Sequence, residues 1–110
     1  MAGFIHVSER VGCSVPSWPF DVMVKEITTA LADAYPEIRT AIRRPLEEGF
    51  DILSLKSLDT LSFKRVALAV TQAHENVRSK AALSVAEQRA LEHWPEVLAA
   101  IAADPRVKEE

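Results

Sequence analysis

The stretch TLSFKRVALAVTQAHENVRSKAA, from Thr60 to Ala82, carries the clearest periodic pattern in this chain. Its apolar positions recur at steps of three and four residues and form one stripe: Phe63, Val66, Val70, Ala73 and Val77. That spacing places them on one face of an α-helix. An isolated amphipathic helix is marginal in water, so the stripe predicts other apolar segments packed against it.

The segments before this helix favour two shorter helices. Asp21 is a suitable N-cap for a helix that runs to about Tyr35, and Pro36 suits the first position of a second helix. Pro45 is expected to interrupt that second helix, and Gly49 is a good C-terminal cap. Residues 50–58 are apolar without clear periodicity, which indicates an irregular connection over the core, and Ser57 or Asp59 then caps the central helix.

The segment after the central helix predicts a third substantial helix. Ser84 and Glu87 have the spacing of a capping box, in which each side chain accepts a hydrogen bond from the other residue's backbone N–H. An apolar stripe continues to Ile101 and keeps its phase across Pro95, which predicts a kink there rather than a break. Residues 105–110 are expected to be a frayed tail.

The first 20 residues differ from the rest. Phe4 to Val7 predict a short strand or a packed extended arm, and Gly12 to Pro19 have turn and loop chemistry. Trp18, between two prolines, is either an anchor that pins the arm onto the helices or an exposed recognition residue. The predicted fold is therefore all-α, a small bundle of four to five helices with an extended N-terminal arm. Its parts are the arm and loop (1–20), the helical domain (21–104) and the tail (105–110).

Size and charge limit the classes of function. The chain has 110 residues, enough for one domain, and a formal net charge of −3, which counts against nucleic-acid binding. A single cysteine, Cys13, excludes an intrachain disulfide and fits a reducing compartment. No basic leader begins the sequence, and no apolar run is long enough to span a bilayer. We expect a soluble, cytoplasmic protein that binds neither nucleic acid nor membrane.

Groups that carry chemistry are few. His6, His74 and His93 lack a second ligand one helical turn away, and the common zinc and di-iron patterns are absent. Cys13 lies among Gly, Ser and Pro without a local catalytic signature. The sequence therefore predicts no catalytic residue, no metal and no cofactor.

Two acidic groups are the best candidates for contact with a partner. Glu47, Glu48 and Asp51 cluster around Phe50, and form either a solvated loop or a docking patch for a basic protein. Glu92 and Glu96 are like charges one turn apart, which either face water or meet a cationic partner. The predicted partner-binding residues are Trp18, Glu47, Glu48, Asp51, Glu92 and Glu96.

These observations favour a small, non-catalytic protein-binding protein, and most concretely an inhibitor or immunity protein that neutralises a toxin or an enzyme by means of an acidic surface. One alternative is a self-associating structural or adaptor protein, a homo-oligomer joined through the arm and Trp18. The other is a metal-dependent or small-molecule enzyme that uses His74, His93 and Cys13. The sequence does not identify the partner, the oligomeric state or the order of helix packing.

Overall fold

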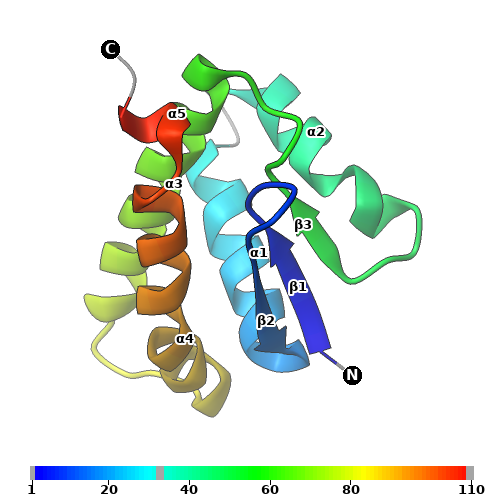
Figure 1. Ribbon diagram of the computed structural model, residues 1–110. Coiled ribbons are helices and arrows are strands. Elements are labelled where there is room, and N and C mark those ends of the chain that lie inside the picture. The colour runs from blue at the N-terminus through cyan, green and yellow to red at the C-terminus, as the bar shows by residue number, and fades with distance from the viewer. Residues whose placement is uncertain (1, 32–33, 109–110) are drawn as a thin grey trace.

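The computed structural model describes residues 2–31 and 34–108. Within them the chain forms β1 (Ala2–His6), β2 (Gly12–Pro16), α1 (Ser17–Leu31), α2 (Pro36–Glu47), β3 (Ile52–Ser54), α3 (Thr60–Arg78), α4 (Val85–Ala102) and α5 (Pro105–Lys108). Helices and a sheet share one core, so the fold is α+β (Figure 1). The prediction of an all-α bundle is wrong.

The three strands form one mixed sheet in the order β2-β1-β3. Strand β1 pairs antiparallel with β2 and parallel with β3, so that Ile5 lies opposite both Cys13 and Leu53. The N-terminal segment is therefore a hairpin rather than an arm, and the connection at 50–58 contributes the third strand. The strands are too short for a reliable alternating pattern, and the hairpin turn lacks the Asn-Gly or Asp-Gly pair that announces such turns.

Side chains on the sheet alternate between the core and solvent. Ile5, Cys13, Val15 and Leu53 are buried on one face. The other face carries Phe4 and its neighbours, and no helix lies in front of it in Figure 1. This open face is the uncovered side of the sheet, and it has the alternation of an antiparallel sheet with one solvated face.

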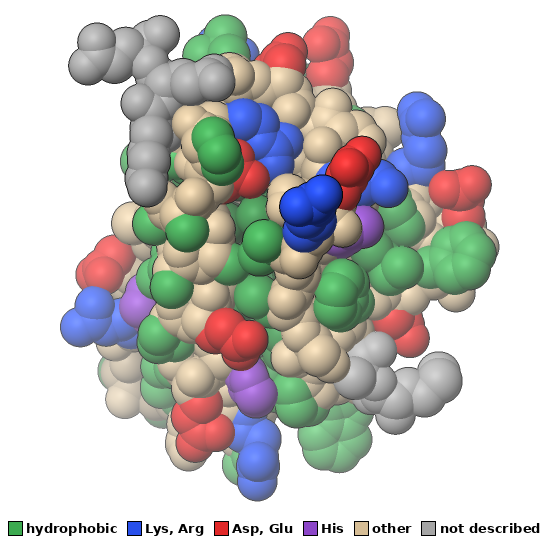
Figure 2. All heavy atoms as spheres, in the orientation of Figure 1, with side chains coloured by type: hydrophobic (Ala, Val, Ile, Leu, Met, Phe, Trp, Pro, Cys, Tyr) green, Lys and Arg blue, Asp and Glu red, His purple; other side chains and the backbone are tan. Residues whose placement is uncertain are grey.

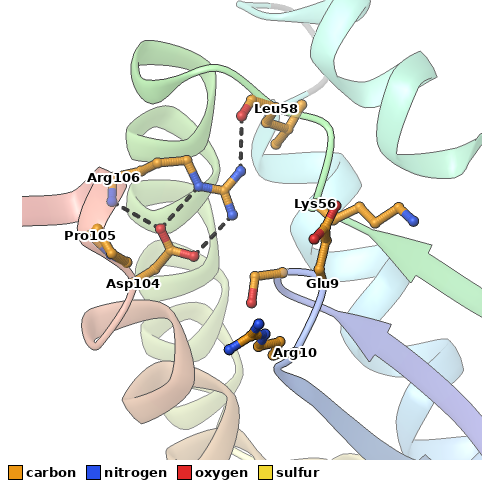
Figure 3. Close-up of a pocket in the computed structure, with 8 residues that line it drawn as sticks. Glu9, Arg10, Lys56, Leu58, Asp104, Pro105 and Arg106 are labelled. Carbon is orange, nitrogen blue, oxygen red and sulfur yellow. Dashed lines mark hydrogen bonds and ion pairs between the residues drawn. The ribbon is translucent and has the colours of Figure 1, made fainter.

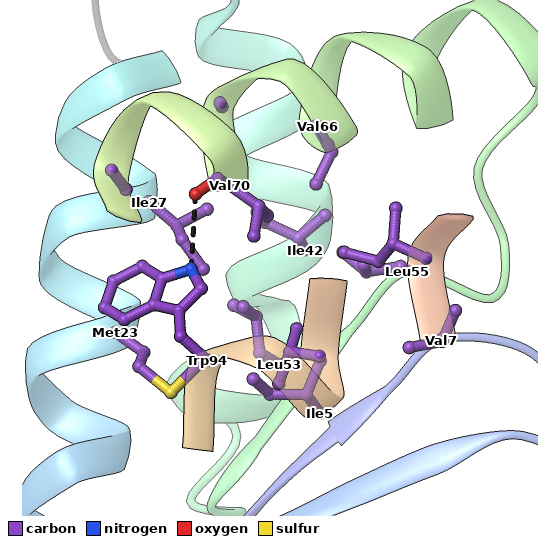
Figure 4. Packing of buried hydrophobic residues seen from close by; sticks show 14 of the residues in the cluster. Ile5, Val7, Met23, Ile27, Ile42, Leu53, Leu55, Val66, Val70 and Trp94 are labelled. Atoms are coloured by element: carbon purple, nitrogen blue, oxygen red, sulfur yellow. Dashed lines mark hydrogen bonds between the residues drawn. The ribbon is translucent and has the colours of Figure 1, made fainter. Parts of the chain in front are cut away.

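The core is built on the predicted stripe of α3, whose five apolar residues are all buried. Trp94 of α4 lies beside this stripe and donates its indole N–H to the backbone oxygen of Val70 at 3.2 Å. Figure 4 shows Met23 and Ile27 of α1 beside this indole, with Ile5 and Leu53 of the sheet nearby. Each such side chain contributes about 1.5–3 kcal/mol by its burial.

The start of α1 and the end of α2 differ from the prediction. Helix α1 begins at Ser17 rather than after Asp21, because Pro19 falls in the first turn, where a missing N–H costs nothing. Helix α2 does begin at Pro36, but it passes Pro45 and runs to Glu47.

The end of α2 confirms the predicted glycine cap. Gly49 has a positive φ of 95°. Its N–H donates to Leu46 O at 3.1 Å, and the N–H of Phe50 donates to Pro45 O at 2.9 Å. This pair of bonds is a Schellman motif, which ends the helix and turns the chain sharply.

The predicted caps of α3 and α4 are confirmed. Asp59 accepts a hydrogen bond from the N–H of Ser62 at 2.7 Å. Ser84 and Glu87 form the reciprocal capping box, and α4 continues through Pro95. Helix α3 ends at Arg78, a turn earlier than predicted. No helix in the described ranges is long and apolar enough to cross a membrane.

Candidate functional site

The open face of the sheet has an apolar centre. Phe4 pairs with Ile52 in the β1–β3 register and is 38% exposed. The backbone N–H of Phe4 donates to Asp51 O at 2.8 Å. This bond holds the loop that contains Phe50 against β1. Phe50 is 59% exposed.

A glycine lets the ring of Phe4 lie across the neighbouring strand. A Cβ added to Gly12 on β2 would lie 2.1 Å from Cζ of Phe4, so the ring occupies the space that any larger residue would need. The ring of His6 lies edge-on to Phe4, with 5.8 Å between the centroids. The open face thus carries a defined aromatic pair rather than isolated apolar residues.

One flank of the open face is the loop that follows α2. Glu47, Glu48 and Asp51 are exposed there, on either side of Phe50. Within the described ranges, no ion pair involves any of these three carboxylates. Because the Schellman motif turns the chain at Gly49, Phe50 and this acidic cluster are presented together beside β3.

The other flank is formed by α4 and the start of α1. Glu92 and Glu96 are exposed on α4, which contacts β2. Burial and, secondly, the charge of Glu96 raise the pKa of the Cys13 thiol on β2, which places Glu96 near that strand. Trp18, 75% exposed, lines a shallow hollow of about 440 Å³ with Arg89 of α4.

The structure therefore distributes the six predicted partner-binding residues over two sides of the sheet. The loop after α2 lies next to β3, and Trp18 and α4 lie next to β2, with the open face between them. In Figure 2 acidic side chains lie on both sides of the sheet. Sequence reasoning named the two flanks separately, but missed Phe4, His6 and Ile52 as parts of a common face, because it did not predict the sheet.

A larger hollow of about 480 Å³ lies near the β1–β2 turn (Figure 3). It is lined by Ser8, Glu9, Arg10, Lys56, Leu58, Asp104, Pro105 and Arg106. The guanidinium of Arg106 donates to the carboxylate of Asp104 and to the backbone oxygens of Val7, Leu55 and Leu58. These bonds use all five of its N–H donors, so Arg106 has none left for a ligand.

The arginine that lines this hollow therefore has a structural role. Arg106 also stacks over the ring of Phe63, with 3.8 Å between its Cζ and the ring centroid. The segment 105–110 was predicted to be a frayed tail, but Pro105–Lys108 form α5, and Arg106 is held by backbone oxygens of two distant segments. Asp104 before Pro105 is a local helix-start signal. No local sequence pattern indicates the distant backbone oxygens that Arg106 binds.

The candidate histidines and the cysteine lie in separate surroundings. The ring of His74 stacks on Trp94, with 5.5 Å between the centroids, and desolvation lowers the pKa of His74. Cys13 is buried in the sheet. Among the residues that the structure describes, no group of three or more His, Cys, Asp or Glu side chains could hold a metal ion.

Comparison with known proteins finds a likeness in fold to a solved structure. No family model matches this chain, and neither does any curated protein. A solved structure, a CdiA-CT toxin from Burkholderia pseudomallei E479 in complex with its cognate CdiI immunity protein, shares the fold with a TM-score of 0.86. The match is 21% identical and covers 96% of this chain and 99% of that chain.

This likeness contradicts two predictions from the sequence. The matched structure is named for a toxin, so it points to a toxin rather than to an inhibitor or immunity protein. The same match is at odds with the prediction of a protein without catalytic activity, which is also contradicted. At 21% identity the match itself establishes only the α+β fold.

Proposed function

We propose that this chain is the toxin of a toxin–immunity pair and that a stable complex with its immunity protein keeps it inactive. The observation that carries the proposal is the shared fold, with a TM-score of 0.86 over 96% of the chain, with a structure solved as a toxin–immunity complex. The protein partner expected from the sequence fits this reading. The open sheet face, with exposed Phe4 and Phe50, offers such a partner an apolar surface.

The likeness favours the toxin role within the pair, and a growth assay tests that role. The chain is expressed from a tightly repressed promoter in the cytoplasm of a bacterial host, alone or together with the protein encoded on either side of its gene. A toxin is expected to arrest growth when expressed alone, and its partner is expected to restore growth. Unimpaired growth at high expression of the folded chain contradicts the toxin role.

A core variant provides the control for the growth assay. Phe63→Asp places a charge at a fully buried position of α3, so the variant is expected not to fold. Growth arrest that persists with Phe63→Asp reflects the burden of expression rather than a toxic activity. Arrest that requires the wild-type chain supports the proposal.

A further inference from the structure

We infer that the partner docks on the open face of the sheet, with Phe4 and Phe50 at the apolar centre, and that it presents basic side chains to the acidic flanks. This inference rests on the proposed function and specifies the surface and the partner's chemistry. The partner is a different protein, with an apolar patch surrounded by Lys and Arg.

The apolar centre has the properties of an interface anchor. Exposed aromatic residues are enriched among the side chains that dominate binding energy. Phe50 directly follows the Schellman motif at the end of α2. The ring of Phe4 packs over the backbone of Gly12 and lies edge-on to the ring of His6. The backbone that carries Phe50 and the position of the Phe4 ring are therefore defined before binding, which lowers the entropy cost of association.

The size of the sheet requires the flanks to take part. Two strands of five residues and one of three, spaced about 4.8 Å apart, give a face of at most roughly 17 by 14 Å, or roughly 240 Å². A standard interface buries about 800 Å² on each partner. The contact must therefore extend from the sheet onto its neighbours, which are the loop after α2 on one side and Trp18 with α4 on the other.

The charge of these flanks determines the partner's chemistry. Five exposed carboxylates without an ion pair among the described residues lie there: Glu47, Glu48, Asp51, Glu92 and Glu96. The bases that share a hollow with residues of these flanks include Arg44, with Glu48, and Arg89, with Trp18. The excess is acidic on both flanks, so a partner with basic residues on both sides of an apolar patch is complementary.

The same charge distribution disfavours a second copy of this chain as the occupant. In a two-fold dimer built on the open face, the same surface lies on both sides of the interface. Both flanks are acidic. Whether each flank meets the same flank or the opposite flank of the second copy, carboxylates therefore face carboxylates. Such like-charge contacts reduce affinity, whereas a basic partner relieves them.

Binding measurements on matched variants test the inference. The probes are the two proteins encoded on either side of this chain's gene, each purified and titrated against the full-length chain. Phe50→Asp places a charge at the apolar centre and is expected to weaken the complex at least about 30-fold, the loss of an interface hot spot. Leu68→Asp on α3 is the control, because Leu68 has the same exposure, 59%.

Charge reversal tests the acidic flank separately. The triple variant Glu47→Lys, Glu48→Lys, Asp51→Lys is expected to slow association about tenfold at low salt and to weaken its dependence on salt. Glu37→Lys, at the opposite end of α2, is the control and is expected to leave the association rate unchanged.

The outcomes separate the inference from the proposed function. Loss of binding with Phe50→Asp and slower association of the triple variant, with both controls unaffected, support the docking face. A complex that tolerates Phe50→Asp and the triple variant overturns the docking face but leaves the paired function intact. No complex with either probe overturns both. A wild-type homodimer that Phe50→Asp dissociates assigns the face to a second copy and likewise overturns the inference.

Discussion

The carboxylate of Asp104 accepts three N–H groups of Arg106, from the backbone, from Nε and from Nη2, each at 2.9 Å. The remaining N–H groups of the guanidinium bind backbone oxygens at the end of β1 and in the connection before α3. Asp104 is nearly buried and Arg106 is largely so. This single side chain therefore fastens α5 to the segments that follow β1 and β3.

The first prediction concerns this arginine. Arg106→Met keeps much of the side-chain volume but removes two of the three donors to the carboxylate of Asp104, together with the guanidinium donors to the backbone oxygens of Val7, Leu55 and Leu58. Breaking a buried pair in this way is expected to cost about 3–5 kcal/mol of unfolding free energy. Urea unfolding measures the loss. Arg78→Met is the control, because its pair with Glu75 is 57% and 59% exposed, and its replacement is expected to cost at most about 0.5 kcal/mol.

The second prediction concerns acid sensitivity. Hydrogen bonds from Lys80 and from the backbone N–H of Ser84 lower the pKa of Glu87 from 4.5 to about 2. Because the pKa of Glu87 is lower in the folded state than in the unfolded state, this carboxylate stabilises the fold above pH 4.5. That contribution is lost as the pH falls from 4.5 toward about 2.

Glu87→Gln tests this linkage. The variant is expected to be less stable than the wild type at pH 6, and the difference is expected to shrink between pH 4.5 and about 2. Urea midpoints measured at several pH values give the comparison. Glu92→Gln on the same helix changes an equivalent charge outside the capping box, so it controls for the effect of net charge. A difference that stays constant across this range contradicts the linkage.

The third prediction compares two glycines on opposite faces of the sheet. A Cβ on Gly3 would lie 2.1 Å from Cγ of Phe20, a buried ring atom close to its backbone. Gly3→Ala therefore overpacks the core and is expected to cost about 1–3 kcal/mol. A Cβ on Gly12 meets only the outer end of the exposed Phe4 ring, which can turn away. Gly12→Ala is expected to change stability by less than about 0.5 kcal/mol.

These glycine variants also bear on docking. Gly12→Ala displaces Phe4 from its place over β2, so it is expected to weaken partner binding while leaving the thermal midpoint nearly unchanged. Equal losses of stability in the two variants would show that Phe4 is as immobile as Phe20. In that case the Phe4 side chain is more rigid than its solvent exposure indicates.

The helices were predictable because their signals are local. The α3 stripe, the Asp59 cap, the Ser84–Glu87 box and the Gly49 cap each depend on residues within a few positions of one another. Local periodicity and capping chemistry determine such elements almost independently of the rest of the chain. Pro45 was misinterpreted because a proline in the last turn of a helix removes one hydrogen bond without ending it.

The sheet and the open face were not predictable in the same way. Strand β3 has three residues, and its pairing with β1 joins positions almost 50 residues apart. A parallel pair of this kind is stabilised by contacts that only the complete fold creates. The acidic flanks could therefore be identified as charge clusters, but not as two sides of one surface. The acceptors of Arg106 are equally distant in sequence.

The most direct test of the central claim is the mass of the particle in solution. The full-length chain is co-expressed with the protein encoded on either side of its gene, and the purified material is measured by light scattering after size-exclusion chromatography. We predict a single particle whose mass equals 12.2 kDa plus the mass of one of these proteins. Elution of this chain by itself at 12.2 kDa in both cases would contradict the claim that it is one component of a toxin–immunity pair.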